Sequence, residues 1–334
     1  MSDLSHLPVP YSIIIEMENA ETIEWHEVAD MFQALVSQIR ENPRDPRSPL
    51  PEIVCIHEGE DTDSHLLYEK VTQEVPELTE LAKLICLGLP DARYYELKNN
   101  GALKSTGDVI IFLDSDSVPQ PGWLEAMLKP FADPQTVVAG GITCLGYDSL
   151  VSRTLALTWI FPLIHGNDPE VARRPVYANN AAFRGTWFRE NPFPSHDGFK
   201  VSCTLHCRLL KEQGHAMVPV DAITVHAPLR GFRFLVWRAW VTGRDADRKV
   251  VAIKGYAWPR RLLRAIKHGL QTQKRCVLRI VCRSHYVDMP WYQVPVALVM
   301  AITFYAIMFF AQVAEVFGML PGGPEHIPHF VENS

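Results

Sequence analysis

The sequence predicts an α/β fold in which helices cover both faces of a mostly parallel sheet. Short apolar runs rich in β-branched residues alternate with segments of helical periodicity between residues 11 and 142. Alternation of this kind is typical of strands that pair in parallel. The chain has 334 residues, of which 47% are hydrophobic and 21% charged, so it can bury a full core in one large or two ordinary domains.

The first half of the chain supplies most of the expected sheet. Pro121 suits the first turn of a helix, and Asn42 to Pro51 is a loop because it is rich in proline and charge. The expected strands are 11–15, 52–56, 92–97, 108–113 and 137–142, and the expected helices are 22–39, 66–87 and 121–131.

The second half is less regular. Segments 179–184 and 218–226 are expected to add strands beside the same sheet, and 150–164 is either a core helix or a membrane-bound segment. Residues 259–283 predict a basic amphipathic helix at a membrane interface, with a break near Gly269.

A strongly apolar segment follows the basic helix. Residues 289–314 contain no charged side chain, and about 20 apolar residues suffice for a helix to span a bilayer. The alternative is a buried helix of a soluble domain. The expected organisation is therefore an α/β domain over 1–230, a basic interface region over 231–288, a transmembrane helix over 289–320 and a short tail over 321–334.

Charge is unevenly distributed. The net charge is −6, yet the segment between Asp247 and Asp288 carries eleven Lys and Arg residues and no acid. Such a basic segment favours an anionic surface and the cytoplasmic side of a membrane. The seven cysteines match no zinc-binding spacing, and the first residues do not resemble a secretory signal, so reduced thiols in the cytosol are expected.

Two acids, Asp114 and Asp116, directly follow the apolar run 108–113. Ligands of open α/β sheets bind at the carboxyl ends of the strands. Two carboxylates there suit a divalent cation that also holds phosphates, whereas the alternative for an isolated Asp-x-Asp is an exposed turn.

An ordered series of motifs surrounds this acidic pair. Lys98-Asn99-Asn100-Gly101 precedes it, Asn180 to Arg184 follows it, and Arg208-Leu209 and Val225-His226 come later. Over about 11–244 the series resembles the family 2 glycosyltransferases, whose catalytic domain has the GT-A fold and which include membrane-associated members.

The resemblance implies roles for individual residues. Asp116 would bind Mg²⁺ or Mn²⁺, with His226 as a second metal or phosphate contact, and Asp114 would contact the ribose or the donor sugar. The residues expected to bind the nucleotide sugar are Glu58, Lys98, Asn99, Asp114, Asn180 and Arg184. Glu16 and Glu18 would repel phosphates unless they turn away from them.

The chain departs from the family at the catalytic base. The family places an acidic pair several residues before Arg-Leu, where this chain has Val201-Ser202. Inverting transfer needs a base for the acceptor hydroxyl, and Asp197 is the nearest carboxylate, with His196 and His206 as weaker candidates.

The resemblance therefore implies a metal-dependent, inverting hexosyltransferase on the cytoplasmic side of a membrane. Its partners would be a nucleotide-sugar donor, a lipid-linked or glycan acceptor and membrane lipids, with no nucleic acid. The alternative is a non-catalytic protein that binds nucleotide sugars or acts as a scaffold, because the acidic pair is replaced. Nucleotidyl transfer is disfavoured, since no Gly-rich phosphate loop with a following Lys lies near the first strand.

Overall fold

The computed structural model divides the chain into two compact units. The first comprises 1–143, 172–195 and 206–227, and the second comprises 144–171, 196–205 and 228–334. The second unit thus includes two segments that lie inside the α/β domain expected from the sequence. The residues that the structure describes are 10–18, 20, 23–42, 48–159, 161–163, 176–196, 201–227 and 232–320.

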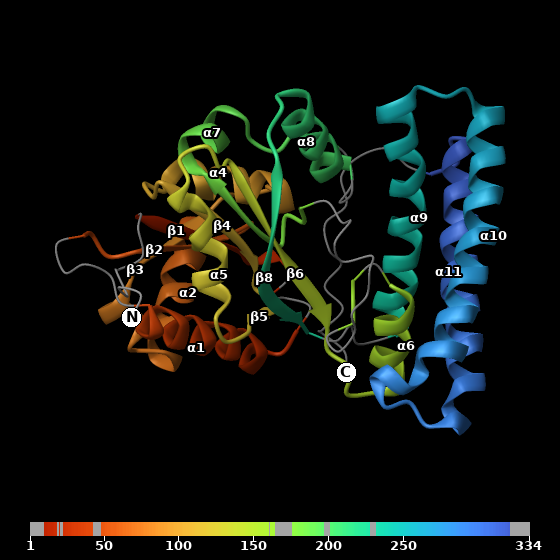
Figure 1. Cartoon of the computed structure of the whole chain (residues 1–334), viewed down its shortest axis with the longest axis horizontal. Helices are drawn as coiled ribbons and strands as arrows, with labels where there is room; N and C mark the ends of the chain where they lie inside the picture. Colours follow the sequence, from red (N-terminus) through yellow and green to blue (C-terminus); the bar gives the residue numbers. More distant parts are fainter. Residues whose placement is uncertain are drawn as a thin grey trace. The chain divides into compact units, whose positions relative to one another are not determined.

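The first unit is built on a mixed sheet with the strand order β3-β2-β1-β4-β7-β6-β8-β5 (Figure 1). Strands β3, β2, β1 and β4 are parallel, while β7 pairs antiparallel with both β4 and β6, and β5 pairs antiparallel with β8. The bounds are β1 Tyr11–Glu16, β2 Glu52–His57, β3 Lys83–Gly88, β4 Val109–Asp114, β5 Ser117–Pro119, β6 Val138–Leu145, β7 Asn180–Arg184 and β8 Met217–His226.

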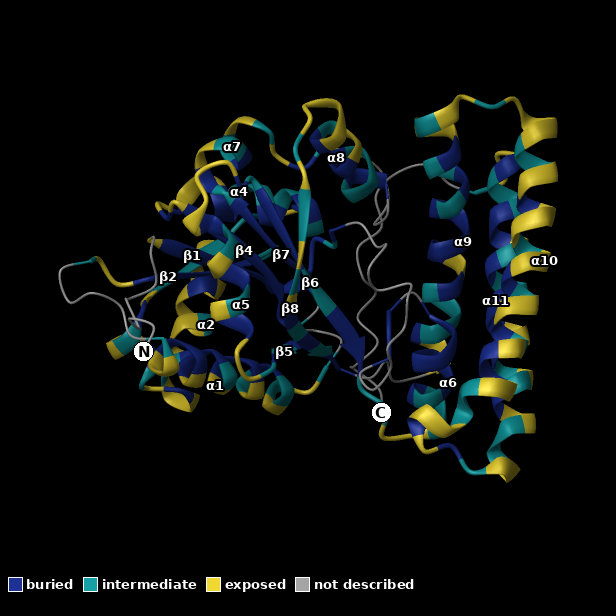
Figure 2. Cartoon of the chain, in the orientation of Figure 1, coloured by how far each residue is buried: buried dark blue, intermediate teal, exposed yellow. Residues whose placement is uncertain are grey.

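Helices cover both faces of this sheet, as the continuous apolar runs of its central strands require. Ile13 and Ile15 of β1 belong to a hydrophobic core shared with α1 (Trp25–Glu41) and α5 (Trp123–Leu128). Ile14 points to the other face, where Gly101 of α4 (Tyr94–Lys104) packs so closely that a Cβ would lie 2.5 Å from the Ile14 side chain. Figure 2 shows the central strands buried. The remaining helices of this region are α2 Asp61–Glu74, α3 Leu78–Leu81, η2 Lys129–Ala132, α7 Gly185–Glu190 and α8 Val201–Glu212.

Two expectations about the third strand are wrong. The helix expected over 66–87 ends earlier, because Lys83–Gly88 is a strand that pairs in parallel with β2. The strand expected over 92–97 is instead the start of α4. The other expected strands and helices of the sheet are present with shifts of a few residues at their ends.

The second unit contains long helices. Its helices are α6 Leu150–Thr158, α9 Phe232–Lys254, α10 Trp258–Arg283, η4 Ser284–Val287, η5 Trp291–Gln293 and α11 Val294–Val316. α6 packs in a hydrophobic cluster with α11, which favours the core-helix alternative for 150–164. α10 continues through Gly269 without the expected break. Residues 291–316 form the one described helix that is long and apolar enough to cross a membrane.

Candidate active site

The carboxyl edge of the parallel strands collects three acids. Asp114 is the last residue of β4 and lies in register with Glu16, the last residue of β1. Asp116 follows two residues later, and only 5% of Asp114 and 4% of Asp116 is exposed. Since parallel strands end at one edge of a sheet, their terminal side chains meet there. The structure therefore places the acidic pair at the edge where α/β proteins bind ligands.

Two side chains of α4 hold Asp114. The Lys98 Nζ lies 2.7 Å from the Asp114 Oδ1, and the Tyr94 hydroxyl donates to the same carboxylate at 2.9 and 3.0 Å. Tyr94 and Lys98 are four residues apart, so they share one helix face. Burial, and then the charge of Asp114, raise the pKa of Tyr94 well above its ordinary value, which keeps the hydroxyl a donor. Lys98 and Tyr94 therefore hold the Asp114 carboxylate in one orientation.

Glu16 lies beside Asp114 at the same edge and is fully buried. Burial, followed by repulsion from Asp114, raises the pKa of Glu16 well above its ordinary value, although Lys98 acts in the opposite direction. A carboxyl group shifted this way keeps its proton at a pH where an exposed glutamate is ionised. The raised pKa therefore weakens the repulsion that Glu16 was expected to exert on a phosphate.

Asp116 faces His226 at the end of β8. The His226 Nε2 lies 3.2 Å from the Asp116 Oδ2, and the Ser117 hydroxyl donates to the other carboxylate oxygen at 3.3 Å. The Ala227 carbonyl lies 2.7 Å from the His226 Nδ1 and can only accept, so Nδ1 carries a proton. Nε2 and a carboxylate oxygen thus converge at the edge of the sheet.

Comparison with known proteins identifies the family. Residues 12–184, just over half of the chain, match the family model described as Glycosyl transferase family 2. The chain belongs to glycosyltransferase family 2. The match covers most of β1 and all of β2 through β7, so it includes Asp114 at the end of β4 and Asp116 just after it.

A solved structure shares the fold. It is the mannosyltransferase PcManGT from Pyrobaculum calidifontis in complex with GDP-Man and Mn²⁺, and it matches with a TM-score of 0.54 at 16% identity. The match covers 94% of this chain and 89% of that one. The GT-A fold implied by the sequence is therefore confirmed.

Two curated relatives match shorter segments. Mouse polypeptide N-acetylgalactosaminyltransferase 15 is 32% identical over 101 residues, which are 29% of this chain and 15% of that protein. N-acetylgalactosaminyltransferase 7 of Drosophila melanogaster is 25% identical over 160 residues, which are 46% of this chain and 23% of that protein. The chain thus spans less than a quarter of the length of either relative.

Asn180 and Glu58 also lie at the carboxyl edge. Asn180 pairs with Leu113 at the start of β7, but its amide group already accepts from the Trp123 indole at 2.9 Å and donates to the Ala222 carbonyl at 2.9 Å. Its amide therefore stabilises the carboxyl edge of the sheet through contacts within the protein. Glu58 is partly exposed and directly follows β2, so it remains placed for contact with a ligand.

Two of the expected nucleotide-sugar residues are engaged by the backbone of the fold. Arg184 pairs with Val109 at the opposite end of β4, and its guanidinium donates to the carbonyls of Phe131, Asp133 and Thr136. The amide of Asn99 is bound on both sides by the Phe193 backbone, at 2.8 and 3.0 Å. Both motif residues thus stabilise the fold, and the structure does not bring Arg184 to the acidic edge.

The position of the family's acidic pair holds no acid. Val201 and Ser202 begin α8, and both are fully buried. His206 lies against Phe183, Phe188 and Phe193, and burial lowers its pKa to about 4. A base with so low a pKa accepts a proton poorly. Asp197 lies outside the described residues, and His196 is exposed.

Tyr94 is the site residue that the sequence did not indicate. Its position fell in a segment expected to be a strand, which would not place it beside Lys98. The four-residue spacing from Lys98 would have indicated it once the segment was recognised as a helix.

Proposed function

We propose that the chain is a metal-dependent glycosyltransferase that moves a hexosyl group from a nucleotide-diphosphate sugar to a membrane-associated acceptor, with inversion. The convergence of Asp116 and His226 at the carboxyl edge of the sheet, beside the fixed carboxylate of Asp114, carries this proposal. The acceptor would be a lipid-linked group or a growing glycan. The basic segment 248–283 supports attachment to the cytoplasmic face of a membrane.

The residues present fit Mg²⁺ or Mn²⁺. Asp116 and His226 would hold it, and the ion would supply positive charge to balance the diphosphate leaving group. The described residues include no cluster of three or more His, Cys, Asp or Glu placed to bind a metal. Two protein ligands suffice where substrate phosphates and water complete the coordination, as is common for Mg²⁺.

The other groups position the reactants. Asp114 is held in one orientation by Lys98 and Tyr94, so its carboxylate can accept from the hydroxyls of the ribose or the donor sugar. Glu58 would contact the base of the nucleotide. Asp197 would take the proton of the acceptor hydroxyl as that oxygen attacks the anomeric carbon. The transition state would have oxocarbenium character.

Donor hydrolysis tests the proposed site. Purified protein is incubated with nucleotide sugars, including GDP-mannose and UDP-N-acetylgalactosamine, with Mn²⁺ or with a chelator. Wild type should release the nucleoside diphosphate only with metal, and Asp116→Asn and His226→Ala should each lower the rate at least 100-fold. Asp221→Asn, at an exposed position of β8, is the control and should match wild type. A wild-type rate for Asp116→Asn would refute the site.

A second candidate is a non-catalytic protein that binds nucleotide sugars. The burial of Val201 and Ser202 where the family has an acidic pair favours it. Calorimetric titration with donor and Mn²⁺ separates the two candidates. Binding that depends on Asp116 without turnover of any donor would select the non-catalytic protein, whereas loss of hydrolysis in Asp197→Asn with binding retained would select the enzyme.

A further inference from the structure

α10 runs antiparallel along α11 over most of its length. The Arg261 guanidinium donates to the Glu315 carbonyl at 3.2 Å, and the Gln273 amide donates to the Ile302 carbonyl at 3.2 Å. Between these contacts, a Cβ on Gly269 would lie 2.8 Å from the Phe309 ring. Figure 1 shows the two helices side by side. If α11 enters a membrane, α10 must therefore enter it to the same depth.

The middle of α10 is too basic for the centre of a bilayer. Lys267 and Lys274 are exposed and flank Gly269 and Gln273, which contact the central turns of α11. Lysines in hydrocarbon are costly and normally face a bundle interior or a partner, and only those near helix ends reach the interface by extending. A membrane-crossing α11 would hold both lysines near the midplane.

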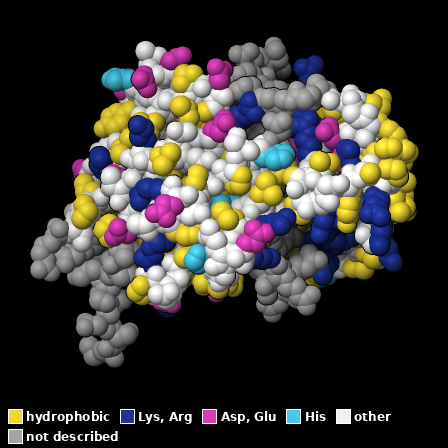
Figure 3. Space-filling view, turned by 90° about the horizontal axis from the view of Figure 1, so that it is seen from above, with side chains coloured by type: hydrophobic (Ala, Val, Ile, Leu, Met, Phe, Trp, Pro, Cys, Tyr) yellow, Lys and Arg dark blue, Asp and Glu magenta, His cyan; other side chains and the backbone are white. Residues whose placement is uncertain are grey.

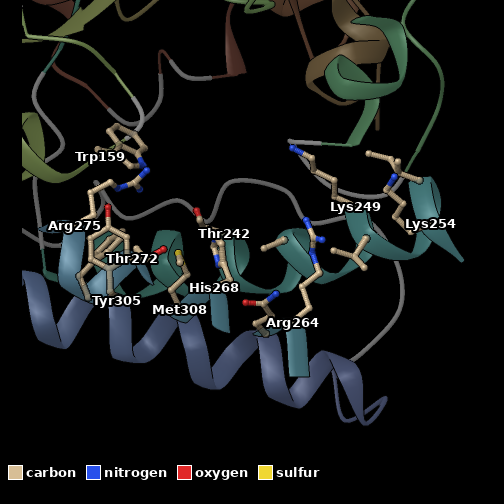
Figure 4. A pocket seen from close by; sticks show the side chains of 15 residues that line it. Trp159, Thr242, Lys249, Lys254, Arg264, His268, Thr272, Arg275, Tyr305 and Met308 are labelled. Atoms are coloured by element: carbon tan, nitrogen blue, oxygen red, sulfur yellow. The ribbon is translucent and has the colours of Figure 1, made fainter. Parts of the chain in front are cut away.

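One face of these helices lines a cationic cavity. The cavity measures about 310 Å³ and lies over α11, between α9 and α10. Figure 4 shows Lys249, Lys254 and Arg264 at one end and Arg275 at the other. The described residues that line it include no Asp or Glu. The lining therefore joins four cations to apolar side chains such as Val250 and Phe304, and it can admit an anion.

The opposite face is apolar and exposed. Leu270 and Phe310 stand two residues from the cavity-lining His268 and Met308, which places them about 200° around their helices from the cavity. Figure 3 shows yellow hydrophobic side chains, with blue Lys and Arg side chains among them, along the right margin of that view. We call the second unit, which contains α9, α10 and α11, the helical unit. We call the following residues the outer face: Leu263, Leu270 and Val281 of α10 and Val299, Ile302 and Phe310 of α11, with exposures of 68, 68, 56, 65, 46 and 64%.

We infer that the helical unit lies in the plane of the membrane, with the outer face in the acyl boundary of an anionic leaflet, and that α11 does not cross the bilayer. Arg260, Lys267 and Lys274 border the outer face on α10, where they reach phosphate headgroups. The absence of any acid from 248 to 287 makes this charge complementary to an anionic lipid surface. α11 is apolar all round because it contacts protein on one side and lipid on the other.

Cysteine reporters at the two ends of α11 test this orientation. Tyr292→Cys and Met319→Cys, at positions 61 and 73% exposed, are introduced separately into full-length protein that carries Cys282→Ser. Sealed membrane vesicles of the expressing cells, with the cytoplasmic face outward, receive a membrane-impermeant maleimide before or after detergent. Labelling is measured by peptide mass. Both reporters should label equally with and without detergent. Protection of one reporter until detergent is added would show that α11 crosses, and would overturn the inference.

Substitutions in the outer face provide a second test. Leu263→Glu combined with Leu270→Glu should weaken binding to phosphatidylglycerol-containing vesicles at least tenfold, with an unchanged circular dichroism spectrum. The control combines Leu66→Glu and Leu103→Glu, at positions 63 and 55% exposed in the first unit, and should bind like wild type. Wild-type binding by the Leu263→Glu and Leu270→Glu protein, or wild type that forms dimers and ignores vesicles, would overturn the inference. The inference rests on the membrane attachment that is part of the proposed function. Donor hydrolysis is measured separately, so failure here leaves the proposed metal site and the donor chemistry untouched.

Discussion

Asp114 and Lys98 form a buried ion pair, and replacing only one of the two residues should destabilise the fold. The exposed fraction of the Lys98 side chain is zero, and its nitrogen lies 2.7 Å from the carboxylate. Removal of one partner leaves an uncompensated charge in a low-dielectric environment, which typically costs about 3–5 kcal/mol. Removal of both charges avoids this cost.

We therefore expect Lys98→Met to lower the free energy of unfolding by about 3–5 kcal/mol. The double variant with Asp114→Asn should recover most of that loss and still fail to hydrolyse donor. Urea unfolding measures the stabilities, and Lys104→Met, at an exposed position of the same helix, is the control. Equal instability of the single and double variants would show that packing, and not charge, makes Lys98 necessary.

His206 makes folding sensitive to mild acid. Its folded-state pKa is about 4 because the ring is buried, against 6.5 for an exposed histidine. The unfolded chain therefore binds this proton more tightly, and stability present above pH 6.5 is lost as the pH falls toward 4. Between pH 7.5 and 5 the loss from this group amounts to about 2 kcal/mol.

His206→Gln should reduce the pH dependence of unfolding over this range by that amount. The glutamine amide can still donate to the Asn191 carbonyl, which His206 contacts at 2.7 Å. Urea unfolding at pH 7.5 and pH 5 measures the slope, and His65→Gln at an exposed position should keep the wild-type slope. An unchanged slope in His206→Gln would mean that another group governs the acid response.

The position of a residue could be predicted from the sequence where it ends or follows a strand. Asp114, Asp116 and His226 terminate or follow strands, so their place at the sheet edge could be predicted. Motif membership alone did not show that Asn99 and Arg184 serve the fold. Their partners are backbone groups more than 45 residues away in sequence, and only the folded chain brings these groups together.

At the level of elements, β3 shows where periodicity fails. Lys83–Gly88 is a short apolar run that directly follows helical residues, so its spacing does not distinguish a strand from the end of a helix. The segment is a strand because it forms hydrogen bonds with β2. These partners are distant in sequence, so local spacing does not reveal them. The central strands β1 and β4 could be predicted because a turn or loop precedes and follows each of them in the sequence.

The packing of α9 on α11 depends on Gly243. A Cβ there would lie 2.0 Å from the Met308 carbonyl oxygen, and a helix backbone cannot yield locally. A Cβ on Gly269 of α10 would meet the Phe309 ring at 2.8 Å, and a ring can rotate away. The two glycines therefore differ in what surrounds them, although both lie inside long helices.

Gly243→Ala should therefore destabilise the helical unit by about 2 kcal/mol or more, despite the gain of about 1 kcal/mol in helix propensity. Gly269→Ala should be close to neutral, because the same gain offsets a small shift of the ring. Thermal unfolding followed by circular dichroism in detergent compares the variants. Equal effects at the two positions would show that the α9–α11 contact is looser than the structure indicates.

For the whole molecule, composition predicted membrane association but could not predict its geometry. The charge-free stretch satisfies the length rule for a spanning helix. The rule considers one helix at a time, whereas α10 lies along α11 and brings Lys267 and Lys274 to its central turns. At about 3 kcal/mol for each lysine at the bilayer centre, crossing would cost roughly 6 kcal/mol for these two alone.

In an in-plane attachment, the cations and the apolar outer face each contribute to the binding free energy, and the two contributions can be measured separately. Each cation near an anionic leaflet contributes about 1 kcal/mol, so Lys267→Gln combined with Lys274→Gln should weaken binding to anionic vesicles about 30-fold at low salt. The defect should shrink as salt screens the surface and should vanish on neutral vesicles. Vesicle sedimentation at two salt concentrations measures it, with Lys104→Gln and Lys129→Gln in the first unit as the control. A helix inserted across the bilayer would retain the protein on every vesicle whatever the charge at 267 and 274, so salt-independent retention of the double variant would contradict the in-plane arrangement.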